Sequence, residues 1–227
     1  MRIVPDYQPI YDLTTRRIFG YEALARGSGG EKPAEIFYQA NRDKQLKEVD
    51  LLCIKAAVAN APSDTNLFVN IFPPTLMWAV STGALNAIPR DGIFLEIVEA
   101  TKSTDIFGGL LDAVDKLRNI GYGIVIDDIS SGYDRLRMLA EMRPHFVKID
   151  RPLICDCHKN KSRRNVIHRL FQMAVDNEAQ VVAEGIEKPD ELLTLDDIGI
   201  RYGQGFLLGY PERRPWENKR KVGAAVV

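Results

Sequence analysis

The chain has 227 residues, and its 30 basic and 31 acidic side chains give a formal net charge of −1. This balance provides no overall field that would attract a nucleic acid polymer or an acidic membrane surface. No apolar run approaches the roughly 20 residues of a membrane span, and Pro5 and Asp6 interrupt the first residues too early for a signal peptide. Three cysteines, an odd number, disfavour a disulfide framework. We therefore expect a cytoplasmic protein that binds neither membrane nor nucleic acid polymer.

Two extended segments, 7–13 and 17–24, open the chain around a polar turn, which favours an antiparallel hairpin. Apolar strands and amphipathic helices then alternate. We predict strands over 67–71, 92–97, 123–128, 146–150, 180–185 and 203–206, and helices over 33–42, 45–61, 106–120, 133–142, 162–177 and 189–197, with another helix beginning at Pro73. The alternation predicts a parallel α/β fold, in one domain over 1–212 followed by a polar, basic tail over 213–227.

The stretch 123–128, Gly-Ile-Val-Ile-Asp-Asp, is the centre of the pattern. Its β-branched run predicts a strand that is buried on both faces. Either Asp127 or Asp128 could cap the next helix, but two adjacent acids leave one without that role. Acids at the end of a buried strand are costly unless a cation neutralises them.

Other predicted strands also end in polar residues, so that the strand ends carry Glu22, Asn70, Glu96, Asp127, Lys148, Glu184 and Gln204. A doubly wound sheet would gather ligands only at its switch point. A closed barrel gathers the carboxyl ends of all its strands around one mouth. A barrel therefore explains these polar ends better.

With Asp128, such a mouth holds five carboxylates, two amides and one ammonium. Oxygen ligands of this kind suit Mg²⁺ or Mn²⁺, and none of the three histidines lies at a predicted strand end, which disfavours zinc. Two neighbouring ions are a common means of attacking a phosphodiester with water. In that chemistry Lys148 would stabilise charge or orient the water, Glu184 is a candidate general base, and Arg26 suits a phosphate contact.

A second stretch, Cys155-Asp156-Cys157-His158, has residue types that bind metals. Its spacing is not that of a zinc ribbon, and the chain has no second cysteine pair. We interpret it as helix or loop.

Seven short motifs follow one another along the chain. They are Glu22-Ala23-Leu24-Ala25-Arg26, Val69-Asn70-Ile71, Leu95-Glu96-Ile97-Val98-Glu99, Asp127-Asp128, Lys148-Ile149-Asp150, Ala183-Glu184-Gly185-Ile186-Glu187 and Gln204-Gly205-Phe206. In this order and spacing the sequence resembles the EAL-domain family, bacterial phosphodiesterases that open cyclic di-GMP to linear pGpG. The resemblance covers nearly the whole chain and implies a (β/α)8 TIM-barrel variant whose first strand is antiparallel to the others, in agreement with the predicted hairpin.

The resemblance implies a role for each matching residue. Two Mg²⁺ or Mn²⁺ ions would be held by Glu22, Asn70, Glu96, Asp127, Asp128 and Glu184, the last acting through water. Catalytic roles fall to Glu184, Lys148 and Asp128. Substrate contacts fall to Gln8, Arg26, Asp50, Glu187 and Gln204. Glu99 matches an acid that anchors the loop after the double-Asp strand, a loop that the family links to dimerisation, so that the expected partners are cyclic di-GMP and a second copy of the chain.

The loop after the two aspartates departs from the family. The usual Phe-Gly-Thr-Gly-Tyr is Ile129-Ser130-Ser131-Gly132-Tyr133 here, and Val98 replaces a threonine. Ser130 would be strained if the loop needed a positive φ there. The alternative function is therefore a weak or inactive EAL domain that senses cyclic di-GMP or binds a protein, but all the acids and the lysine are present, which favours an enzyme.

Overall fold

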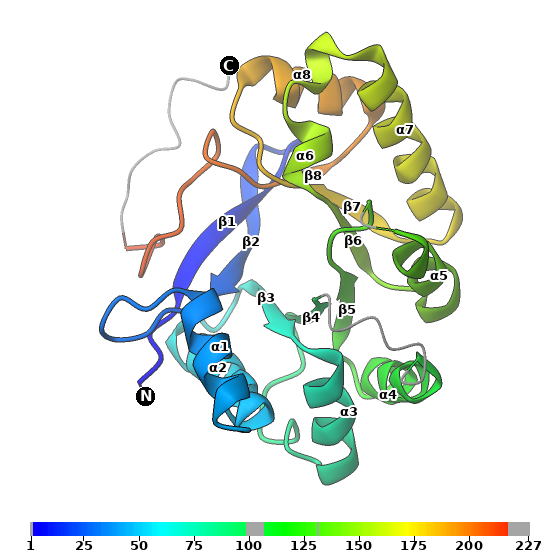
Figure 1. The fold of residues 1–227 in the computed structure, drawn as a ribbon. Coiled ribbons are helices and arrows are strands. Elements are labelled where there is room, and N and C mark those ends of the chain that lie inside the picture. The colour runs from blue at the N-terminus through cyan, green and yellow to red at the C-terminus, as the bar shows by residue number, and fades with distance from the viewer. Residues whose placement is uncertain (1, 99–106, 131, 218–227) are drawn as a thin grey trace.

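Eight strands close into a barrel in chain order, and helices surround it (Figure 1). The structure is a computed structural model that describes residues 2–98, 107–130 and 132–217. The strands are β1 Asp6–Asp12, β2 Arg17–Leu24, β3 Asn66–Ile71, β4 Ile93–Ile97, β5 Gly123–Ile126, β6 Phe146–Ile149, β7 Gln180–Ala183 and β8 Tyr202–Gly203. The helices are α1 Pro33–Arg42, α2 Leu46–Asn60, α3 Pro73–Thr82, α4 Phe107–Asn119, α5 Tyr133–Met142, α6 Arg151–Ile154, α7 Lys161–Asp176 and α8 Pro189–Ile198, with a 3₁₀ turn, η2, over Cys157–Lys159.

The first strand runs antiparallel to both of its neighbours. Gln8 pairs with Glu22 on β2, and Tyr11 pairs with Gly203 on β8. The other neighbouring strands are parallel, with Asn70 of β3 beside Glu96 of β4. The predicted (β/α)8 barrel with an antiparallel first strand is therefore confirmed.

The last strand is shorter than predicted. β8 ends at Gly203, because the chain then turns so that the N–H groups of Leu208 and Gly209 both bond to the carbonyl of Gly205. The tract 155–158, expected as helix or loop, lies at the end of α6 and in η2. None of the helices in the described part of the chain has the length and apolar character needed to cross a membrane.

Side chains inside the barrel form two layers, because residues i and i+2 of a strand point to the same face. The apolar layer, which we call the plug, consists of Ile10, Phe68, Val125, Phe146, Val182 and Tyr202, with Phe19 and Phe94 packed against it. Its rings are in contact: Phe68 stacks on Phe94 with centroids 4.7 Å apart and meets Phe146 edge-on at 5.3 Å. Six polar residues each follow a plug residue by two positions, within the strand or directly after its end: Asn70, Glu96, Asp127, Lys148, Glu184 and Gln204. Alternation thus places the polar layer directly over an apolar floor.

The outer core lies between the strands and the helices, where Leu51, Ile54 and Ala57 of α2 are buried. Tyr7 reaches from β1 to donate its hydroxyl to the carbonyl of Ala57 at 2.7 Å. The chain after the barrel returns to the same place, since Trp216 packs edge-on against Tyr7 at 4.9 Å. Both α2 and the segment that contains Trp216 therefore hold the first strand in place.

Phe68→Ala should lower the free energy of unfolding by about 3–5 kcal/mol, because it empties the centre of the plug. Urea unfolding followed by circular dichroism measures this loss. Tyr38→Ala is the control, at a side chain that is 71% exposed, and should change stability by less than about 0.5 kcal/mol. A loss for Phe68→Ala as small as that of the control would mean that the plug does not stabilise the barrel.

Candidate active site

A buried lysine lies at the centre of the polar layer. Lys148 is only 1% exposed, and its ammonium is 2.7 Å from Glu96 Oε1, 3.0 Å from Glu22 Oε2 and 2.5 Å from Glu184 Oε1. Burial alone would lower the pKa of Lys148, but the neighbouring carboxylates, Glu184 foremost, raise it well above its usual value. The lysine therefore keeps its positive charge, and its contacts join β6 to strands on the other side of the mouth.

Amide side chains orient Glu22. Gln204 donates Nε2 to Glu22 Oε2 at 2.6 Å and to Gln8 Oε1 at 2.9 Å, and Asn70 donates to the other Glu22 oxygen at 3.2 Å. Burial opposes ionisation of Glu22, but Lys148 and these amides outweigh it and lower its pKa. Glu22 is thus held as a carboxylate with both oxygens fixed.

The other acids of the layer are less well compensated. Burial raises the pKa of Glu96 well above its usual value and that of Glu184 to about 7, despite Lys148. Within the described residues, the buried Oε2 atom of Glu96 has no hydrogen-bond partner. One ammonium therefore does not satisfy the carboxylates that surround it, and a further cation would lower the cost of their burial.

Two groups of carboxylates are close enough to share cations. Ligand atoms of Glu22, Glu96 and Glu184 lie within 4.8 Å of one another, as do those of Asp127, Asp128 and Glu184. Glu184 belongs to both groups. Carboxylate and amide oxygens are the donors that Mg²⁺ and Mn²⁺ prefer. The side chains present therefore fit the expected divalent cations.

The two adjacent aspartates mark a sharp change in backbone direction. Asp128 has φ 49°, in the left-handed region that Asp tolerates better than most residues. Burial, together with the charges of Asp127 and Asp150, raises the pKa of Asp128 to about 6. The backbone turn gives the second acid a direction that a continuing strand would not.

The following loop is braced without the glycine of the related family. Ser130, where strain would follow from a positive φ, does not have one. Its hydroxyl instead bonds to the Asp150 carboxylate, and the Ile129 N–H bonds to the Lys148 carbonyl at 3.0 Å. Arg135 of α5, which sequence reasoning missed, is 5% exposed and donates to the Ile97 carbonyl at 3.2 Å. Its signal in the sequence was a charge in helical register with buried apolar residues.

Arg26 and Glu187 lie outside these carboxylate groups, and Glu99 lies outside the described residues. Arg26 pairs with Asp6 at 3.0 Å. Glu187 forms a two-bond ion pair with Arg151, at 2.8 and 2.9 Å. These contacts place both residues in salt bridges of their own.

A cavity of about 340 Å³ opens beside the first carboxylate group. Glu22 and Asn70 form one side of it, and mainly apolar side chains, including Phe37 and Phe72, form the rest. Asp50 also lines this cavity, and its carboxylate accepts a hydrogen bond from the Phe72 N–H at 2.9 Å. The cavity has the size and mainly apolar lining of a small-molecule site.

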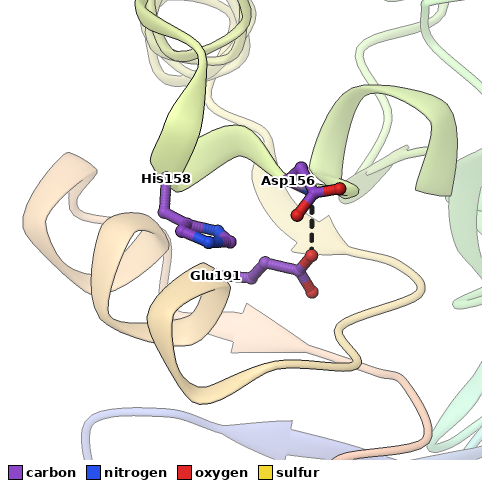
Figure 2. A group of neighbouring side chains, drawn as sticks. All are labelled: Asp156, His158 and Glu191. Atoms are coloured by element: carbon purple, nitrogen blue, oxygen red, sulfur yellow. Dashed lines mark hydrogen bonds between the residues drawn. The ribbon is translucent and has the colours of Figure 1, made fainter.

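A third group of potential ligands, Asp156, His158 and Glu191, lies where η2 meets α8 (Figure 2). Its charges are already compensated. Glu191 accepts backbone hydrogen bonds from Asp156, Glu187 and Lys188 at 2.8–3.0 Å. Asp156 pairs with Lys188 at 2.6 Å, and that bond is the main reason that its pKa falls to about 2. The arrangement is a helix cap and ion-pair network, so that we assign no metal to it.

The fold and the site define a (β/α)8 protein whose acidic side chains, at the carboxyl ends of the strands, have the composition and spacing to hold a divalent cation. The chain belongs to the EAL domain family, whose model matches residues 1–211. The predicted family is thereby confirmed.

Three relatives illustrate the range of the family. BluF of Escherichia coli, a blue light- and temperature-regulated antirepressor, is 31% identical over 212 residues, covering 88% of this chain and 52% of BluF. The cyclic di-GMP phosphodiesterase TpdA of Vibrio parahaemolyticus is 24% identical over 208 residues, covering 90% and 36%. The calcium/cy-diGMP complex of Klebsiella pneumoniae BlrP1 superposes with a TM-score of 0.82 at 27% identity, over 93% of this chain and 56% of that one, and the manganese complex gives 0.80. The chain thus spans about half or less of each relative.

Asp50→Asn should change how stability depends on pH, since burial raises the pKa of Asp50 to about 7. Between the unfolded value of about 4 and 7, the folded state holds more protons at this residue than the unfolded state, so that Asp50 makes stability fall as pH rises. Asparagine keeps an acceptor for Phe72 and removes this effect. From pH 5 to pH 8 the variant should gain on the order of 2 kcal/mol relative to wild type.

Urea unfolding of both proteins at the two pH values, in EDTA, measures this difference. Asp64→Asn, in the exposed turn before β3, is the control and should follow wild type. The same pH dependence in Asp50→Asn as in wild type would contradict the assigned burial of charge.

Proposed function

We propose that this chain is a divalent-metal-dependent phosphodiesterase that hydrolyses cyclic di-GMP to linear 5′-pGpG. The observation that carries the proposal is the pair of carboxylate groups that share Glu184, in which a buried oxygen of Glu96 has no described hydrogen-bond partner. One relative, TpdA, is a cyclic di-GMP phosphodiesterase, and BlrP1 binds cyclic di-GMP in its complex. The complete set of acids around Lys148 supports cleavage rather than binding alone.

The chain's own residues have distinct parts in this proposal. Two Mg²⁺ or Mn²⁺ ions held by the residues of the two carboxylate groups, with Asn70, would activate water and offset phosphoryl charge. Water forms a bond to phosphorus while the bond to the 3′ oxygen breaks, which leaves a 5′ phosphate and a free 3′ hydroxyl. Glu184, with its pKa raised to about 7 by burial, suits the acceptance of a proton from water near neutral pH. Lys148 stabilises the negative charge that develops.

Substrate recognition would use the region beside the carboxylates. The cavity next to Glu22 can take one guanine base, and Asp50 on its wall can meet the base edge. Arg26, at the end of β2, can offer a phosphate the guanidinium donors that it does not use toward Asp6. Glu187 and Gln204 complete the proposed pocket, and the homodimer and cytoplasmic location expected from the sequence belong to the same proposal.

The second candidate is a domain that binds cyclic di-GMP without cutting it. The similarity to BluF, whose name describes an antirepressor, favours this candidate. The altered loop at Ser130 also favours binding without cleavage, because it directly follows the two aspartates of the second carboxylate group.

Incubation with cyclic di-GMP and Mn²⁺, followed by chromatography, should yield pGpG with the wild-type chain. Asp127→Asn should reduce turnover on the order of 100-fold or more, because it removes a charge from the second carboxylate group while keeping the size of the side chain. Asp115→Asn, on the exposed face of α4, is the matched control. Intact nucleotide at high enzyme concentration, with binding detected by calorimetry, would establish the sensor instead.

Arg26→Ala should raise KM about 10-fold or more and change kcat little, because its proposed contact is to a phosphate that is charged in both ground and transition states. Steady-state kinetics separate the two parameters. Arg213→Ala is the control, since Arg213 pairs with the same Asp6 at 2.9 Å and has no proposed substrate contact. Loss of kcat at unchanged KM would assign Arg26 to catalysis instead.

A further inference from the structure

We propose that Lys148 is an exchangeable counter-ion of the metal site: its ammonium holds the carboxylates of Glu22, Glu96 and Glu184 together, and a divalent cation that binds them displaces it. The inference rests on the proposed function only in taking these acids as metal ligands. It gives the lysine a role in assembling the site, separate from any contact with reacting groups.

The contacts of Lys148 favour exchange over joint occupancy. The three oxygens that Lys148 contacts, Oε2 of Glu22 and Oε1 of Glu96 and Glu184, belong to residues that form one ligand group within 4.8 Å. A Mg²⁺ ion on such oxygens would lie about 2.0–2.1 Å from each, and therefore within a few ångströms of the ammonium. Two cations so close in a partly dry site repel strongly. The ammonium must move away before the ion can use these oxygens.

The lysine is also needed when no metal is bound. Lys148 and Glu96 are each 1% exposed, and Glu22 is 7% exposed, so that water does little to separate the negative charges. The amides of Gln204 and Asn70 supply hydrogen bonds to Glu22 but no positive charge. Removing the ammonium would leave buried carboxylates to repel one another, which is strongly destabilising.

Lys148→Met tests both consequences, because methionine fills similar space without charge. Without metal, the variant should melt about 5–10 °C below wild type. It should also bind Mn²⁺ about 10-fold more tightly, because no ammonium has to be displaced, and its Tm should rise more than that of wild type when Mn²⁺ is added. If Lys148 only orients water, neither the Tm without metal nor the Mn²⁺ affinity should change. If it only fills space, the Mn²⁺ affinity should not increase.

The experiment is calorimetric titration of EDTA-treated protein with MnCl₂, with melting curves and no nucleotide. Lys188→Met is the control. Lys188 pairs with Asp156, in the group that also contains His158 and Glu191, so that its removal should leave Mn²⁺ affinity unchanged. A gain in affinity for Lys188→Met instead would place the ion in the Asp156 group and overturn the proposal. Equal melting of Lys148→Met and wild type, or unchanged Mn²⁺ affinity, would also overturn the exchange without bearing on the proposed hydrolysis.

Two further measurements test the proposal even if Lys148→Met does not fold. Lys148→Met/Glu96→Gln removes one of the repelling acids and should regain at least half of the lost Tm; no recovery contradicts the charge argument. In wild-type protein labelled with ¹⁵N-lysine, one slowly exchanging ammonium signal should be present in EDTA and shift with Mg²⁺. Absence of that signal, or its insensitivity to saturating Mg²⁺, would overturn the proposal. Failure of wild type to bind any metal would reject both the exchange and the proposed hydrolysis.

Discussion

Repulsion between the buried carboxylates at the mouth of the barrel is the constraint on which this structure depends. A barrel brings every strand end to one mouth, so that Glu22, Glu96 and Glu184 come within hydrogen-bonding distance of one ammonium. Much of the surrounding structure compensates for this: amides fix Glu22, and Lys148 is buried although burial alone opposes its charge. The raised pKa values of Glu96 and Glu184 show that compensation is incomplete. Residual strain of this kind is typical of functional sites, which are less stable than a core optimised for packing alone.

The molecule contains a useful contrast to this mouth. Glu191 is as buried as Glu96, yet its oxygens accept hydrogen bonds from three backbone N–H groups. Its neighbour Asp156 has a lysine partner at 2.6 Å. Both groups place acids within ligand distance of one another. An unsatisfied buried carboxylate oxygen and the raised pKa values of Glu96 and Glu184, rather than residue type or proximity, separate the candidate active site from a structural brace.

Much of this arrangement could be predicted from the sequence because it depends on local patterns. A β-branched run ending in Asp127 and Asp128 defines both a buried strand and its polar end. Alternation of strands and helices predicts a parallel α/β fold, and the polar ends of its strands favour a barrel. Partner choice across the barrel could not be predicted, since Lys148 and Glu22 are 126 residues apart. The Arg26–Asp6 pair leaves no mark in short-range spacing, and the helical register of Arg135 marks a buried face of α5 without showing that its partner is the Ile97 carbonyl. The early end of β8 depends on a turn at Gly205 that only the folded backbone shows.

The plug beneath the polar layer has a consequence for molecular traffic. Phe68, Phe94 and Phe146 close one end of the barrel with rings in direct contact. A molecule that reaches Lys148 must therefore enter and leave through the same opening, so that a bound molecule blocks the next one until it dissociates. The barrel is open at one end only, and the residence time of a bound molecule therefore limits the rate at which the mouth can exchange one molecule for another.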